Sequence, residues 1–190
     1  IFELITSVKG ICVKTKPDHQ TGTDRIFEVY ETFLKKKPKI IINLQGDMPN
    51  IDPSNIQMLS SYMKKNLCDI ATLASKFTNE KEIENTNNVK VITKKALSNN
   101  QFDEAIDFFR KIENEKKRYI YHHIGIYAFT KEALLRYVSL KRTINELDRN
   151  LEQLRALENN MNIHVGYTPF SPLSIDTEED LKNIQKLMKL

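Results

Sequence analysis

The stretch around which this chain is organised is Ile40-Ile41-Ile42-Asn43-Leu44-Gln45-Gly46-Asp47-Met48-Pro49. A short β-branched run that ends at a glycine and a proline predicts a strand buried on both faces. In open α/β sheets, ligands bind beyond the carboxyl ends of the strands, which is where Gln45 and Asp47 stand. A lone carboxylate there suits Mg²⁺, which takes few protein oxygens together with substrate phosphates. A strand-to-loop turn that leaves Asp47 in solvent also explains these residues.

The composition is that of an ordinary globular protein, with 190 residues, 40% hydrophobic and 28% charged, and a net charge of +4. This length predicts a single domain, 1–190. The mild and scattered positive charge argues against nucleic acid as the main partner and is compatible with an anionic substrate. Cys12 and Cys68 stand far apart, which favours neither a disulfide nor a zinc site and points to a reducing cytoplasm. The sequence contains no apolar run of membrane-spanning length and no secretory signal, so no membrane partner is expected.

Strand and helix patterns alternate along the chain, which predicts βαβ units in a mainly parallel twisted sheet with helices on both faces. Strands are expected at 11–13, 40–44, 70–74, 89–92, 119–129 and 163–165. The clearest helix is expected at 144–159, where its charged residues would form a surface ion-pair ladder. The charged segment 94–118 is expected to form an excursion from the sheet.

Three further positions could contribute to a site. Arg25 lies near an expected helix start, where anions bind, but a solvent-exposed pair with Asp24 or Glu28 also explains it. His123 shares a strand face with Tyr127 and is either a ligand-binding or a satisfied structural histidine. Asp176 precedes the expected cap of the last helix, where it could complement the helix dipole or reach a metal at the strand ends.

Six motifs occur in the order and rough spacing of one enzyme family: Asp18-His19-Gln20-Thr21-Gly22-Thr23-Asp24-Arg25, Asn43-Leu44-Gln45-Gly46-Asp47-Met48-Pro49, Asn88-Val89-Lys90-Val91, His123-Ile124-Gly125-Ile126-Tyr127, Leu151-Glu152-Gln153-Leu154-Arg155 and Ile175-Asp176-Thr177-Glu178-Glu179-Asp180-Leu181. From about residue 5 to its end, the chain resembles the CMP-Kdo synthetases. These cytidylyltransferases activate 3-deoxy-manno-octulosonate (Kdo).

The resemblance implies a Rossmann-like nucleotide-diphospho-sugar transferase fold and the reaction CTP + Kdo → CMP-Kdo + diphosphate, used in lipopolysaccharide biosynthesis. It implies a homodimer in the cytoplasm. Asp47 and Asp176 match the family's Mg²⁺ carboxylates and are the expected catalytic and metal-binding pair. Arg25 matches a basic position that could face the sugar carboxylate or the nucleotide. The positions that match the sugar pocket are Gln45, His123, Tyr127, Glu152 and Gln153.

The chain departs from the family pattern in three places. The first βαβ unit, whose Arg- and Lys-bearing loop grips the CTP phosphates, has no counterpart, so we expect an N-terminally incomplete domain with an exposed strand edge. Met48 replaces a glutamate. The arginine-bearing segment before the long strand is eroded to residues 108–112, and Arg149 replaces another glutamate.

These departures keep alternatives open. One is an inactive remnant or fragment of the enzyme that lacks the CTP phosphate loop. Another is an enzyme of the related type that activates sialic acid. A third is an unrelated α/β sugar-phosphate binder whose aspartates are structural.

Overall fold

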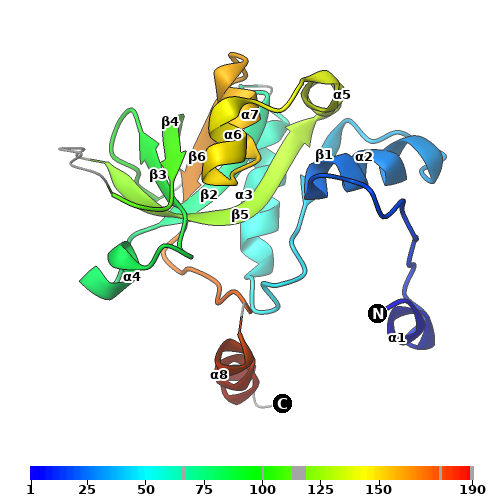
Figure 1. Cartoon of the computed structure of the whole chain (residues 1–190), viewed down its shortest axis with the longest axis horizontal. Coiled ribbons are helices and arrows are strands. Elements are labelled where there is room, and N and C mark those ends of the chain that lie inside the picture. The colour runs from blue at the N-terminus through cyan, green and yellow to red at the C-terminus, as the bar shows by residue number, and fades with distance from the viewer. Residues whose placement is uncertain (66, 100, 113–118, 176, 189–190) are drawn as a thin grey trace.

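The computed structural model describes residues 1–65, 67–99, 101–112, 119–175 and 177–188. These residues form one six-stranded sheet and eight helices (Figure 1). Their order is α1 (Phe2–Ser7), α2 (Gly22–Thr32), β1 (Ile40–Asn43), α3 (Pro53–Met63), β2 (Ile70–Ser75), α4 (Glu80–Glu84), β3 (Lys90–Thr93), β4 (Phe102–Phe109), β5 (Ile120–Thr130), α5 (Lys131–Ser139), α6 (Ile144–Arg149), α7 (Gln153–Glu158), β6 (Ile163–Tyr167) and α8 (Glu178–Met188). None of the described helices is long and apolar enough to cross a bilayer.

The sheet has the strand order β1-β5-β2-β6-β4-β3, and β5 pairs with β3 as well. The α/β class is as predicted. The expectation that neighbouring strands are mainly parallel is wrong, because among the described strands only β2 and β6 pair in parallel. The reason is β5, a long strand that runs antiparallel between β1 and β2. The strands that the sequence predicts as parallel neighbours are therefore separated by an opposed one.

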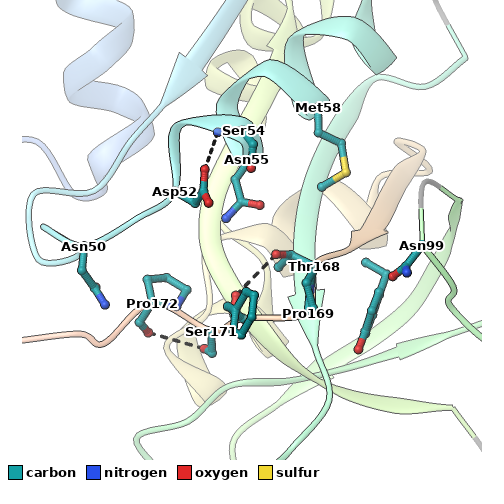
Figure 2. Close-up of a pocket in the computed structure, with 12 residues that line it drawn as sticks. Asn50, Asp52, Ser54, Asn55, Met58, Asn99, Thr168, Pro169, Ser171 and Pro172 are labelled. Carbon is teal, nitrogen blue, oxygen red and sulfur yellow. Dashed lines mark hydrogen bonds between the residues drawn. The ribbon is translucent and has the colours of Figure 1, made fainter.

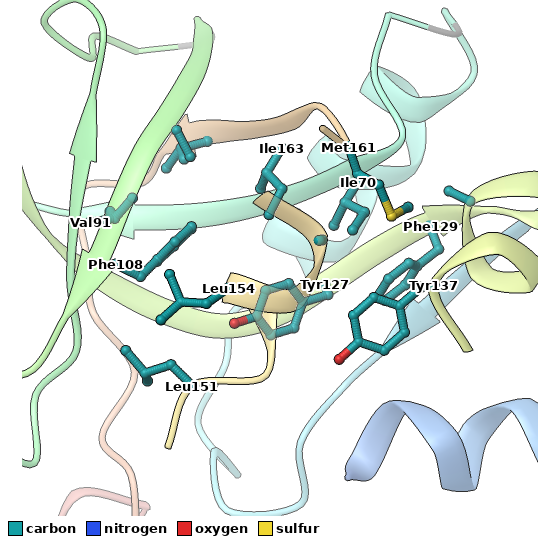
Figure 3. Close-up of a cluster of buried hydrophobic side chains, with 14 of the residues drawn as sticks. Ile70, Val91, Phe108, Tyr127, Phe129, Tyr137, Leu151, Leu154, Met161 and Ile163 are labelled. Atoms are coloured by element: carbon teal, nitrogen blue, oxygen red, sulfur yellow. The ribbon is translucent and has the colours of Figure 1, made fainter. Parts of the chain in front are cut away.

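Helices cover both faces of the sheet, as predicted. Successive residues of β2 point to opposite sides, so that Ile70 joins one hydrophobic cluster and Ala71 the other. The first cluster lies under α5 and α7 and includes Tyr127, Phe129 and Tyr137 (Figure 3). The second lies under α3. Figure 1 shows α1 and α8 at the periphery, away from the sheet.

The strand β1 alternates in burial, with Ile41 and Asn43 buried and Ile40 and Ile42 only partly covered. The expectation that it is buried on both faces is therefore wrong. Within the described residues β1 pairs with β5 alone, so it forms an edge of the sheet. An apolar strand edge was expected from the sequence, and the edge seen here is that of β1.

Two other segment predictions are wrong. The predicted excursion at 94–118 is wrong for its described part, because β4 lies inside the sheet between β3 and β6, while residues 100 and 113–118 lie outside the described residues. Its acidic residues hid the strand pattern, although Ala105, Phe108 and Phe109 are buried. Residues 11–13 form no strand.

Candidate functional site

The described residues enclose an open cleft of about 1100 Å³ near the end of β1 and the first half of β5. Its walls come from the β1–α3 loop, the α4–β3 loop, β5, the start of α7 and the loop before α8. Six of the eight site residues predicted from the sequence line it together: Gln45, Asp47, His123, Tyr127, Glu152 and Gln153.

Asp47 follows β1 and is exposed at the cleft. The Ser174 hydroxyl donates to its carboxylate at 3.2 Å, and the N–H of Ile175 donates to its backbone carbonyl at 2.9 Å. These bonds bring the segment just before Asp176 to Asp47. Asp176 itself lies outside the described residues, so its predicted role stays a prediction. Met48, in contrast, is buried and packs in the second hydrophobic cluster.

His123 is held inside β5, where it is 7% exposed. The centroids of the Phe108 and His123 rings lie 5.1 Å apart with the rings nearly perpendicular, and the centroid of the tilted Tyr127 ring lies 5.3 Å from that of His123. Burial, with a smaller contribution from neighbouring His122, lowers the pKa of His123 to about 3. His123 is therefore a neutral imidazole at physiological pH, which can bind a ligand through hydrogen bonds but not through charge.

The predicted helix 144–159 is interrupted, and the interruption places Glu152 and Gln153. Helix α6 ends at Arg149, the capping residue Asn150 has a left-handed backbone with φ 52°, and α7 starts at Gln153. The expectation of one continuous helix is wrong because asparagine tolerates this conformation and turns the chain. Gln153 thus stands in the first turn of α7, at the cleft.

Glu152 is anchored to neighbouring helices. Its carboxylate accepts a hydrogen bond from the N–H of Thr23 at 3.4 Å, and its backbone carbonyl accepts one from the Tyr137 hydroxyl at 3.0 Å. Burial raises the pKa of Glu152, and the hydrogen bonds from Thr23 and Thr21 oppose that rise. The carboxyl group is therefore preorganised at the cleft by α2 and α5.

A cluster of buried charged side chains links α6 and α7, the helices on either side of this turn. Arg155 is 2% exposed and donates to both carboxylate oxygens of Glu146, at 2.9 and 2.6 Å, while Arg142 donates to the same carboxylate at 2.9 Å. Asp24 lies 3.6 Å from Arg155. The expectation of a surface ion-pair ladder is wrong for Glu146 and Arg155, because a pattern of charges does not reveal which of them pair inside the fold.

Arg25 is not among the residues that line the cleft. Its guanidinium donates to the Thr15 hydroxyl and, at 3.0 Å, to the Lys16 carbonyl, and so fastens α2 to the preceding loop. The structure therefore places Arg25 in a local contact, and its proposed contact with a sugar carboxylate or nucleotide stays a prediction.

Arg110 lines the cleft and was not among the predicted site residues. It follows β4 in the segment that departs from the family pattern, and its guanidinium donates to the carbonyls of Thr86 and Asn87 at 3.3 and 3.2 Å. Among the described lining residues it is the only lysine or arginine, opposite four carboxylates: Asp47, Glu82, Glu152 and Asp180. The available signal was an arginine directly after a strand, but the strand itself was not predicted.

The excess of carboxylates over basic side chains in the described cleft lining favours the binding of a divalent cation. Among the described residues, no group of three or more His, Cys, Asp or Glu side chains is placed to hold a metal. Mg²⁺ needs fewer, because it completes its shell with water and substrate phosphates. The exposed Asp47 carboxylate suits such a partial site, and Asp176, the predicted second ligand, lies outside the described residues.

A second hollow of about 560 Å³ lies beside the cleft and shares Ser171 and Pro172 with it (Figure 2). Its lining is mostly amides and hydroxyls, and the carboxylate of Asp52 is engaged in capping α3 through the N–H of Ser54 at 2.8 Å. None of the predicted site residues lines it. The larger cleft is therefore the candidate site.

The sequence matches a family model described as cytidylyltransferase over residues 1–163. It is 39% identical over 189 residues to the 3-deoxy-manno-octulosonate cytidylyltransferase of Bartonella henselae, a match that covers 99% of this chain and 77% of the relative. The enzyme of the same name from Rhizobium meliloti is 38% identical over 192 residues, which cover 99% of this chain and 75% of the relative.

Comparison with solved structures gives a result consistent with these sequence matches. A structure of CMP:2-keto-3-deoxy-manno-octonic acid synthetase complexed with CTP matches with a TM-score of 0.84 and 29% identity, covering 98% of this chain and 76% of that one. A UDP-glucose pyrophosphorylase complexed with UDP-glucose matches with a TM-score of 0.66 at 14% identity and 70% of its own length, which shows a shared fold alone.

Proposed function

The chain belongs to the cytidylyltransferase family, and we propose that within it the protein is a 3-deoxy-manno-octulosonate cytidylyltransferase that converts CTP and Kdo to CMP-Kdo and diphosphate. The observation that carries this proposal is the convergence of six residues on one cleft. They come from motifs more than 100 positions apart in the sequence, and they meet in a fold that superposes on a CTP-bound synthetase.

The proposed chemistry is an in-line displacement. The anomeric hydroxyl oxygen of Kdo forms a bond to the α-phosphorus of CTP, the bond from that phosphorus to the bridging oxygen of diphosphate breaks, and the hydroxyl proton passes to solvent. Such a reaction depends on positioning and on stabilisation of the developing charge.

The cleft residues are proposed to provide that positioning. Asp47 and Asp176 would hold Mg²⁺. Mg²⁺, when bound, offsets the charge of the triphosphate and of the leaving diphosphate. Gln45, His123, Tyr127, Glu152 and Gln153 would bind hydroxyls of the sugar. Arg110 would bind an anionic group of either substrate, because it is the only lysine or arginine among the described residues that line the cleft.

Three features of the whole protein belong to the same proposal. The protein would act in the cytoplasm, where CTP is made available. It would serve lipopolysaccharide biosynthesis, since Kdo is a component of that polymer. It would work as a homodimer, as the family resemblance implies.

The test is coupled release of diphosphate from CTP, Kdo and Mg²⁺. Asp47→Asn keeps the size of the side chain and removes the charge that would hold the cation, so we expect release to fall at least 100-fold, since electrostatic contacts at a reacting phosphate are of that order. Asp148→Asn is the matched control, because Asp148 is exposed and does not line the cleft. Equal activity in the two variants would contradict the role of Asp47. If the unaltered chain released no diphosphate while still binding Kdo, the alternative of a fragment without the CTP phosphate loop would replace the proposal.

A further inference from the structure

The pairing of β2 with β5 is interrupted at Thr72. Thr72 pairs with Tyr127, but the next residue, Leu73, pairs with Ile124, so Gly125 and Ile126 are extra residues on β5. Such a bulge turns backbone groups away from the ladder, and bulges often occur beside active sites. The turned carbonyl oxygens of Ile124 and Ile126 lie 3.1 and 2.8 Å from the Thr72 hydroxyl oxygen.

The same hydroxyl lies 2.9 Å from Nε2 of His123. Thr72 is completely buried, so its hydrogen bonds are made within the protein. A hydroxyl has one proton to give, and the two carbonyl oxygens beside it can only accept.

These facts fix the direction of the hydrogen bonds. If Thr72 gave its proton to Nε2, its oxygen would face two carbonyl oxygens without any hydrogen between them. If His123 carries the proton on Nε2, His123 donates to Thr72, and Thr72 donates to a bulge carbonyl. The second arrangement is favoured, because the Thr72 oxygen then has a donor, its proton has an acceptor, and one carbonyl oxygen rather than two faces it without a hydrogen.

We propose that Thr72 is a positioning residue that holds His123 in the Nε2–H tautomer, so that the bare Nδ1 faces the ligand as a hydrogen-bond acceptor for a sugar hydroxyl. The identity of the ligand as a sugar rests on the proposed function, whereas the tautomer does not. No hydrogen bond to Nδ1 exists within the part of the chain that the structure describes, and His123 lines the cleft. Phe108 and Tyr127 pack against the ring, and among the described residues Nδ1 is its one polar atom without a hydrogen bond.

The arrangement makes His123 selective for ligands that place a hydrogen-bond donor at Nδ1. A neutral ring with a bare Nδ1 accepts a hydrogen bond from a hydroxyl, but it repels a carbonyl or carboxylate oxygen placed at the same point. Because a buried polar atom without a partner is costly, a ligand that lacks a donor there is disfavoured.

The direct test is the ¹⁵N NMR spectrum of the histidine rings in the free chain, in which a protonated and a bare ring nitrogen have well-separated shifts. The His123 signals are identified by their loss in a His123→Gln variant. We expect a protonated Nε2 and a bare Nδ1. Thr72→Val removes the hydroxyl at nearly constant shape, and we expect it to yield a mixture of tautomers. Thr72→Ser keeps the hydroxyl and should restore the single tautomer.

A kinetic measurement extends the test to the ligand. One neutral hydrogen bond corresponds to about 0.5–1.5 kcal/mol, so Thr72→Val should raise KM for Kdo about 3- to 10-fold and leave KM for CTP unchanged. Thr72→Ser should behave like the unaltered chain. A protonated Nδ1 in the unaltered chain, or the same single tautomer in Thr72→Val, would overturn the inference. Both outcomes are read in the absence of turnover, so they are distinct from a failure of the proposed enzyme activity.

Discussion

At the scale of single residues, Arg110 stands out because no other lysine or arginine among the described residues lines the cleft. Its guanidinium is fixed by two loop carbonyls, and its own carbonyl accepts a hydrogen bond at 2.7 Å from Nζ of the fully buried Lys90. Lys90 also donates to the carbonyls of Asn85 and Asn88. The loop beside the cleft and Arg110 are therefore tied to β3 as one unit.

Arg110→Gln should weaken binding of the anionic substrates. Hydrogen bonds to charged groups contribute about 1.5–3 kcal/mol, so we expect KM to rise by about tenfold or more, with a smaller effect at high salt. Lys111→Gln removes the same charge from an exposed neighbour that does not line the cleft, and it should change KM little. Steady-state kinetics at two salt concentrations measure both. Equal effects of the two substitutions would show that Arg110 acts only through the general field of the protein.

At the scale of elements, the turn between α6 and α7 decides where the cleft residues stand. Asn150 has φ 52° and ψ 52°, and its N–H reaches back to the carbonyls of Glu146 and Leu147. The left-handed conformation is unfavourable for residues with a Cβ, and asparagine and glycine tolerate it best. Position 150 therefore favours a residue that tolerates the left-handed conformation.

Asn150→Ala should lower stability by about 1 kcal/mol, whereas Asn150→Gly should be close to neutral. Both substitutions remove the side-chain amide, so the difference between them reports the backbone conformation alone. Urea unfolding of the two variants measures it. Equal losses in alanine and glycine would contradict a role for the left-handed turn.

The individual strands and helices also show what could be predicted from the sequence. The Ile40–Asn43 strand and the β5 signal were readable because each has a local cause in β-branching or aromatic content. The antiparallel insertion of β5 was not readable, because strand direction depends on partners distant in sequence. Strand β4 was missed because its acidic side chains broke the apolar pattern, and with it the position of Arg110 was missed. Six of the site residues were predicted through the family motifs, and the Thr72–His123 contact required the bulge.

At the scale of the whole molecule, buried ionisable groups make stability depend on pH. His123 has a lowered pKa of about 3, so below its ordinary value of 6.5 the unfolded chain binds a proton that the folded chain does not. Burial raises the pKa of Glu146, but the hydrogen bonds from Arg155 and Arg142 outweigh it, so the net shift is downward. The Glu146 contribution is present above about pH 4.5 and is lost as the pH falls through its folded-state pKa.

The unaltered chain should therefore lose stability as the pH falls below 6.5, and His123 should contribute up to about 1.4 kcal/mol for each pH unit. His123→Gln cannot take up that proton, so its stability should fall less between pH 6.5 and 5. Urea unfolding at the two pH values measures the difference. A variant as pH-sensitive as the unaltered chain would show that the dependence arises elsewhere, for example at His122 or His164, whose pKa values burial also lowers.

The placement of β5 also has a consequence for synthesis on the ribosome. Strand β1 ends at Asn43, and its partners in β5 begin at Tyr127, so residues 44–126 must be made before β1 can pair. At about 5–20 residues per second, the Ile40–Ile42 segment waits about 4–17 s with both edges open. The lysines and the proline that precede it are the kind of gatekeeper residues that keep such a segment from joining another nascent chain. The residues that line the cleft run from Gln45 to Asp180, so the cleft too is completed only late in translation.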